Sequence, residues 1–127
     1  MSFDTILAIS HFADHAKHTL LNQQGDTASH LLVVTDGWIK LFRQTTGGDE
    51  AVMAVLTRGD IFGEAAIIAG ASYPFAAEAA EPSRLMRIPG AVLRQLARDN
   101  HEIMAQIMRI MSRELKSPRW KTSTSRL

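Results

Sequence analysis

The chain has 127 residues, of which 46% are hydrophobic and 21% charged, with a formal net charge of +1. These values are those of one ordinary globular domain, and they provide no overall field that would attract a nucleic acid or a membrane surface. The sequence contains no cysteine, which excludes disulfides, thiolate zinc sites, cysteine-ligated iron–sulfur clusters and cysteine nucleophiles.

No apolar run approaches the ~20 residues that a membrane helix requires, and the first residues lack the basic and apolar segments of a leader peptide. We therefore expect a cytoplasmic protein without a membrane partner. From Lys116 onward the chain has four basic residues and no acidic one. We expect a single domain over residues 1–118 and a flexible basic tail over residues 119–127.

The N-terminal segment predicts a short helix, because apolar residues between Phe3 and Lys17 recur at roughly helical spacing. Short apolar or β-branched runs bounded by Gly, Asp and Pro then predict strands. These runs are Leu31–Thr35, Trp38–Gln44, Ala51–Leu56, Phe75–Ala80 and Arg84–Ile88. The Asp36-Gly37 pair predicts a hairpin between the first two. Turns at this regular spacing are typical of an all-β sandwich, roll or barrel.

After Pro89-Gly90 the hydrophobic period becomes helical, and residues 101–115 predict a longer helix. Its polar residues Glu102, Gln106, Arg109 and Arg113 form a narrow stripe. The apolar arc is wider than packing on one roll requires, and pairs of its residues repeat every seven positions, as in a coiled coil. We predict a homodimer seam formed by Ile103, Met104, Ile107, Met108, Met111 and Leu115. A deeply buried core helix is the alternative.

Several spaced motifs together resemble the sensor domain of the CRP/FNR superfamily, the cyclic-nucleotide-binding fold. The matching residues are Asn22–Asp26, Leu31–Arg43, Arg58–Ala66 and Glu78–Ile88. The resemblance implies a mainly β fold with flanking helices: an eight-stranded β-roll (a double-stranded β-helix or jelly roll), a short N-terminal helix and a long C-terminal dimerisation helix. It also implies that DNA is bound only through a helix-turn-helix module that these residues do not include.

The candidate effector site lies around the Phe-Gly-Glu step at residues 62–64. In cyclic-nucleotide-binding relatives a Gly-Glu pair presents backbone N–H groups to the phosphate and a carboxylate to the ribose, and Gly63 and Glu64 match that pair. The phosphate-pairing arginine of the family falls at Pro74, which can neither donate a hydrogen bond nor neutralise a phosphate. The predicted ligand-binding residues are Phe62, Gly63, Glu64, Ala65, Pro74, Phe75 and Ala76.

The sequence does not assign the identity of the cofactor, because Pro74 weakens the case for a cyclic nucleotide. The cluster Tyr73-Pro74-Phe75 resembles the branch whose effectors are not nucleotides, which includes haem-dependent, nitric-oxide-responsive regulators. On a helix, His11, His15 and His18 would share one face, and neutral imidazole can bind haem iron. An exposed polar helix end explains the same residues.

We expect an effector-binding regulatory domain, not an enzyme, that signals by rearranging its dimer helix. One alternative is a degenerate or truncated dimerisation module without a ligand, and another is a haem or nitric-oxide sensor. A cupin-like metal enzyme would need several histidines converging from strands. Only His30 lies near a predicted strand.

Overall fold

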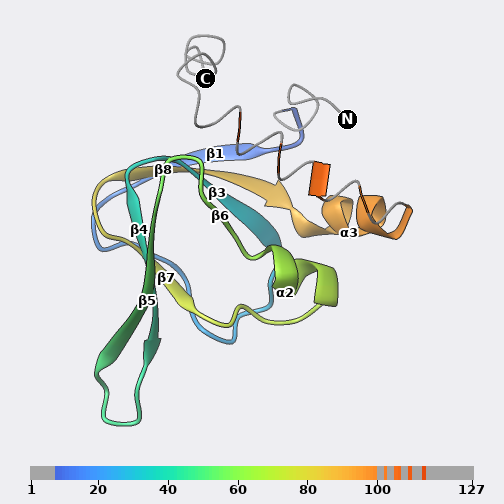
Figure 1. The fold of residues 1–127 in the computed structure, drawn as a ribbon. Coiled ribbons are helices and arrows are strands. Elements are labelled where there is room, and N and C mark those ends of the chain that lie inside the picture. The colour runs from blue at the N-terminus through green and yellow to red at the C-terminus, as the bar shows by residue number, and fades with distance from the viewer. Residues whose placement is uncertain (1–7, 100–101, 103–104, 107–108, 110–112, 114–127) are drawn as a thin grey trace.

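The computed structural model describes residues 8–99 together with 102, 105, 106, 109 and 113. Eight strands form two four-stranded antiparallel sheets, with one short helix between β6 and β7 and another after β8 (Figure 1). Sheet A has the order β1-β8-β3-β6 and sheet B the order β2-β7-β4-β5. The elements are β1 (His11–His15), β2 (Leu20–Asn22), β3 (His30–Asp36), β4 (Trp38–Gln44), β5 (Glu50–Thr57), β6 (Ile61–Phe62), α2 (Glu64–Ala69), β7 (Ala76–Ala79), β8 (Ser83–Pro89) and α3 (Gly90–Asp99).

Among the described strands, the chain crosses from one sheet to the other at every connection except that between β4 and β5, which are the only consecutive strands that pair. The predicted hairpin at Asp36-Gly37 is therefore wrong, because β3 belongs to sheet A and β4 to sheet B. Gly37 is instead a corner between the sheets, with φ of 92°. The expectation of an eight-stranded roll in two sheets is confirmed.

Two hydrophobic clusters hold the roll together, one on each face of sheet A. The cluster between the sheets contains Leu32 and Val34 of β3, while Leu31 and Val33 belong to the cluster that includes residues of α2 and α3. All four side chains are buried. A strand covered on both faces reads as a continuous apolar run, which explains the unbroken sequence at residues 31–34.

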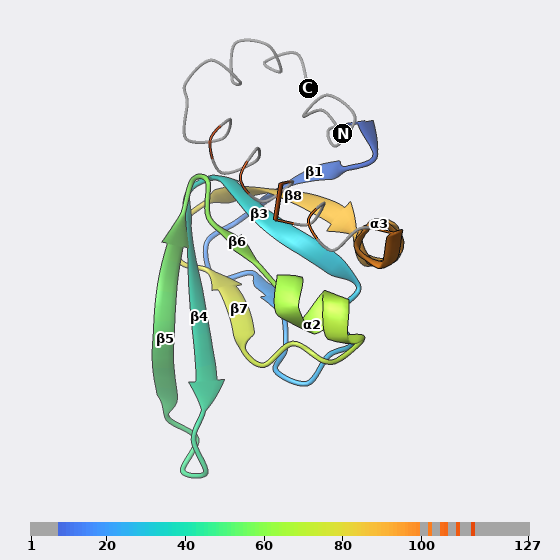
Figure 2. The same cartoon turned by 45° about the vertical axis from the view of Figure 1, so that its right-hand side comes forward.

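The β4–β5 hairpin extends beyond the rest of the roll (Figure 2). Its turn is closed by the Thr45 N–H, which donates to the Asp49 carbonyl oxygen at 2.7 Å. The pairing register shifts between Leu41, opposite Ala54, and Phe42, opposite Val52, so Met53 is an extra residue on β5. Strand β5 is the outer strand of sheet B.

The predicted helix from Phe3 to Lys17 is wrong over His11–His15, which form strand β1 paired with β8. Phe12 packs against the cluster that includes α2 and α3. Backbone pairing with β8 and the packing of Phe12 against this cluster override the helical spacing of the segment.

At the C-terminal end, α3 begins after β8 as predicted, and residues 102, 105, 106, 109 and 113 are helical and exposed. Four of these are the polar residues that the sequence placed on one stripe. The predicted dimer seam, formed by Ile103, Met104, Ile107, Met108, Met111 and Leu115, lies outside the described residues. No described helix has the length and hydropathy needed to span a membrane.

Candidate ligand-binding site

Helix α2 begins and ends at a glycine with a left-handed backbone. Gly63 has φ of 96° and Gly70 has φ of 65°. No side chain caps the N-terminus of α2, and a Cβ on Gly63 would lie 3.0 Å from Cε1 of Tyr73. Glycine at residue 63 therefore allows both the left-handed turn and the close approach of Tyr73.

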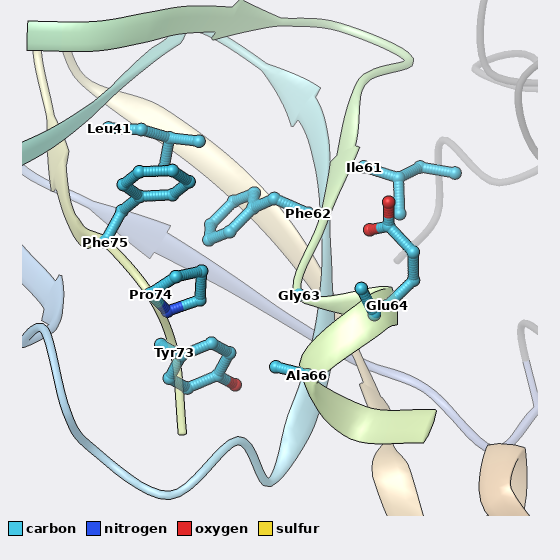
Figure 3. Close-up of a pocket in the computed structure, with 10 residues that line it drawn as sticks. Leu41, Ile61, Phe62, Gly63, Glu64, Ala66, Tyr73, Pro74 and Phe75 are labelled. Carbon is cyan, nitrogen blue, oxygen red and sulfur yellow. The ribbon is translucent and has the colours of Figure 1, made fainter. Parts of the chain in front are cut away.

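A cavity of about 280 Å³ lies between α2 and the segment that leads into β7 (Figure 3). It is lined by Leu41, Ile61, Phe62, Gly63, Glu64, Ala65, Ala66, Tyr73, Pro74 and Phe75. Six of the seven predicted ligand-binding residues are among them. The seventh, Ala76, lies elsewhere and lines a separate hollow. The predicted ligand-binding residues did not include Leu41, Ile61, Ala66 or Tyr73.

Tyr73 is the buried polar aromatic residue of this cavity, and its hydroxyl is fully engaged. It donates to the His30 carbonyl oxygen at 2.7 Å and accepts from the His30 N–H at 3.2 Å. The tyrosine thereby ties the cavity wall to the start of β3, and its hydroxyl has one donor and one acceptor function already used. The sequence analysis grouped Tyr73 with Pro74 and Phe75 but did not count it among the predicted ligand-binding residues.

The chemistry of the lining is strongly apolar. Among the described residues that line the cavity, Glu64 is the only carboxylate and no side chain is a cation. Figure 3 shows the rings of Phe62, Tyr73 and Phe75 gathered with Pro74 on one side, while the Glu64 carboxylate extends towards Ile61. Such a cavity favours an apolar ligand body and provides one hydrogen-bond acceptor.

One guanidinium stands next to the cavity without lining it. The Nε of Arg43, near the end of β4, donates to the Pro74 carbonyl oxygen at 3.1 Å. The guanidinium carbon lies 4.8 Å from the centroid of the Phe75 ring. The backbone of Phe75 is also held by Asn22, whose Nδ2 donates to the Phe75 carbonyl oxygen at 2.9 Å.

The larger hollow, of about 610 Å³, contains Ala76 and has a more polar lining. Its acidic residues Glu50 and Glu78 both contact Lys40, at 2.7 and 3.5 Å. The hydrogen bond that Lys40 donates to the Glu50 carboxylate is the main cause that raises the pKa of Lys40. Because this lysine already compensates both carboxylates, we take the smaller cavity as the candidate site.

A group of basic side chains lies on sheet A. Arg87 of β8 pairs in register with His11 of β1 and Leu32 of β3. Within the part of the chain that the structure describes, Nε of Arg87 and Nε2 of His15 are buried without a hydrogen-bond partner. Burial and then the charge of Arg87 lower the pKa of His15, against a smaller opposing effect of Asp14.

His30 behaves in the same way. Burial lowers its pKa, and the charges of Arg87 and His11 lower it further. The helical face predicted for His11, His15 and His18 is absent, because the first two lie on a strand. Among the described residues, no three His, Cys, Asp or Glu side chains are grouped closely enough to hold a metal ion.

These histidines predict a pH dependence of folding. A histidine whose pKa is lowered by folding binds more protons in the unfolded chain, so stability falls as pH falls below the ordinary value of about 6.5. We expect the free energy of unfolding, measured by urea titration between pH 7.5 and pH 5, to decrease on acidification. The double variant His15→Gln/His30→Gln should decrease less, and parallel curves for the two proteins would contradict this assignment.

The fold and the cavity define a class: an antiparallel β-roll of two sheets that carries a short glycine-bounded helix beside a cavity. The sequence pattern of the cyclic nucleotide-binding domain family matches residues 14–100. The chain is 36% identical over 96 residues to the fumarate and nitrate reduction regulatory protein of Vibrio cholerae, covering 76% of this chain and 38% of that protein.

Two solved structures share the fold. A candidate cyclic nucleotide binding protein of Ruegeria pomeroyi is 37% identical with a TM-score of 0.75, covering 94% of this chain and 53% of that one. The sensor domain of the transcriptional regulator DNR from Pseudomonas aeruginosa is 28% identical with a TM-score of 0.69, covering 85% and 73% of the two chains.

The chain therefore belongs to the cyclic nucleotide-binding domain family, as the resemblance to CRP/FNR sensor domains implied. It spans about two fifths of the length of the curated regulators that it matches.

Proposed function

We propose that this chain is the effector-sensing part of a cytoplasmic CRP/FNR-type transcription regulator. The observation that carries the proposal is the cavity, which is built from α2 and the segment before β7 and includes the Gly63-Glu64 pair that the resemblance to CRP/FNR sensor domains singled out. In this function the chain binds a small molecule and performs no chemical conversion. DNA contact belongs to another module of the regulator.

The route from the cavity to the rest of the regulator runs through α2 and α3. Ile67 of α2 is fully buried in the same cluster as Leu93 of α3. A Cβ on Gly90, the first residue of α3, would lie 3.2 Å from Cγ2 of Ile67. A ligand that prefers one position of α2 would therefore shift the populations of α3 positions, and with them the geometry of a homodimer formed by the helix that follows.

Cyclic AMP and cyclic GMP should bind this chain more weakly than micromolar. The described residues of the cavity lining include no cation to meet the cyclic phosphate, and hydrogen bonds to a charged group contribute roughly 1.5–3 kcal/mol. Calorimetric titration with each nucleotide measures this directly. A dissociation constant at or below the micromolar range would contradict the prediction.

The reverse change is a useful control. Pro74→Arg places a guanidinium where nucleotide-binding relatives have theirs, and it should raise cyclic AMP affinity by about tenfold or more. If neither protein binds a nucleotide or any other small molecule, the alternative of a dimerisation module without a ligand is favoured. A haem sensor would instead show a Soret band that survives gel filtration after haem addition.

A further inference from the structure

We propose that Arg43 recognises an acidic group of the effector, so that the cavity takes a compact apolar molecule carrying a single carboxylate or phosphate. The inference rests on the proposed function and names the chemical class of its ligand. Its basis is the position of the Arg43 guanidinium against Pro74 and Phe75, two residues that line the cavity.

The backbone of β4 directs Arg43 to the cavity side of sheet B. Side chains alternate along a strand, and β4 pairs with β7 without a register shift from Ile39 to Phe42. Arg43 therefore shares a face with Leu41, which lines the cavity. Its side chain is exposed, so a group at the mouth of the cavity can reach it.

The contacts of Arg43 orient the guanidinium and leave part of it available. The Nε–H bonds to the Pro74 carbonyl oxygen, and the planar group stacks on the Phe75 ring. Among residues 8–99, none of the ion pairs of the structure includes Arg43. The two terminal nitrogens carry four further donors in a planar fork that matches a carboxylate or a phosphate.

The remainder of the lining sets the other properties of the ligand. Leu41, Phe62 and Phe75 offer an apolar surface, and a cavity of about 280 Å³ is at the small end of the range for ligand sites. A ligand that meets Arg43 at the mouth directs its acidic group away from Glu64, whose carboxylate would repel it. This orientation needs no cation at residue 74, where a proline stands in place of the arginine of nucleotide-binding relatives.

The test uses three probes that differ in one group: phenylacetate, phenyl phosphate and the uncharged phenylacetamide. Binding to the 127-residue chain is followed by NMR, with the Nε–H signal of Arg43 and the ring signals of Phe75 as reporters. We expect phenylacetate or phenyl phosphate to bind in the millimolar range, which is typical of ligands with so few atoms. Phenylacetamide should bind about fivefold or more weakly.

Variants separate recognition by Arg43 from simple support of the cavity wall. Arg43→Gln should weaken the acidic probe by about fivefold or more and leave phenylacetamide unchanged, while Arg43→Lys should have an intermediate effect. Arg98→Gln is the matched control, because Arg98 is an exposed arginine of α3 whose bond is to Gln95, and it should bind all probes like the wild type. Thermal melting by circular dichroism checks that each variant is folded.

Two results would overturn the inference, and they have different consequences for the proposed function. Equal binding of acid and amide, or an acid affinity that Arg43→Gln does not change, removes Arg43 as the recognising residue but leaves the cavity as an effector site. Absence of binding by all three probes removes the inference and also counts against the proposed function. The source of the acidic group follows from which of phenylacetate and phenyl phosphate binds more tightly.

Discussion

Gly37→Ala should destabilise the folded chain by about 2–5 kcal/mol. The residue forms the corner between β3 and β4 with φ of 92°, and a Cβ there would lie 2.7 Å from the Cα of Ser83 and would also meet its Oγ. A left-handed backbone costs a non-glycine residue roughly 1–2 kcal/mol, and overpacking adds roughly 1–3 kcal/mol. Because the obstacle includes backbone of β8, a change of rotamer cannot relieve it. Urea unfolding measures the loss.

Two other glycines are controls that separate the cost of a left-handed backbone from the cost of a steric clash with Ser83. Gly48 has φ of 87° and open space around its Cβ position, whereas Gly47 has open space and no positive φ. Gly48→Ala should therefore cost only the backbone term of roughly 1–2 kcal/mol, and Gly47→Ala should stay within about 0.5 kcal/mol of the wild type. If Gly37→Ala costs no more than Gly48→Ala, the collision with Ser83 is not real.

Ile67→Ala should be the most destabilising change in α2, with a loss of about 2–5 kcal/mol. The side chain is fully buried in the cluster that joins α2, α3 and sheet A, and truncation leaves a void beside Gly90. Urea denaturation should show a lower midpoint with an unchanged slope. In the proposed function, the same variant should also weaken the link between the occupied cavity and α3.

The neighbouring residue of the same helix is the control. Ile68 is 49% exposed, so Ile68→Ala removes little buried surface, and alanine favours the helix. We expect its stability to remain within about 0.5 kcal/mol of the wild type. Similar losses for the two variants would show that burial of the Ile67 side chain does not control the stability of α2.

The sequence predicted the strands that are identifiable from local composition. The apolar run at residues 31–34 identifies β3, which is covered on both faces. The Gly47-Gly48 pair marks the turn of the hairpin that β4 and β5 form. It failed where long-range pairing decides the structure. Residues 11–15 have helical spacing, yet β8 recruits them as a strand, and Asp36-Gly37 has a hairpin composition but turns a corner between sheets.

Only the part of the candidate site that a local sequence motif defines could be predicted. Gly63 and Glu64 are adjacent in the chain, and a local motif identifies them. Tyr73 and Arg43 enter through contacts with His30 and Pro74, which are 43 and 31 residues away in the sequence. No local sequence pattern indicates that Arg43 of β4 will place its guanidinium beside Pro74, the residue that stands in place of the family's arginine.

The extra residue in β5 has a consequence for association between copies of this chain. An outer strand offers its unpaired N–H and C=O groups to any extended segment that approaches it, and Val52, Met53 and Val55 add about half-exposed apolar side chains. The displaced backbone at Met53 interrupts that row of groups. An approaching strand can therefore continue the ladder on only one side of Met53, which limits open-ended growth of sheet B into fibres.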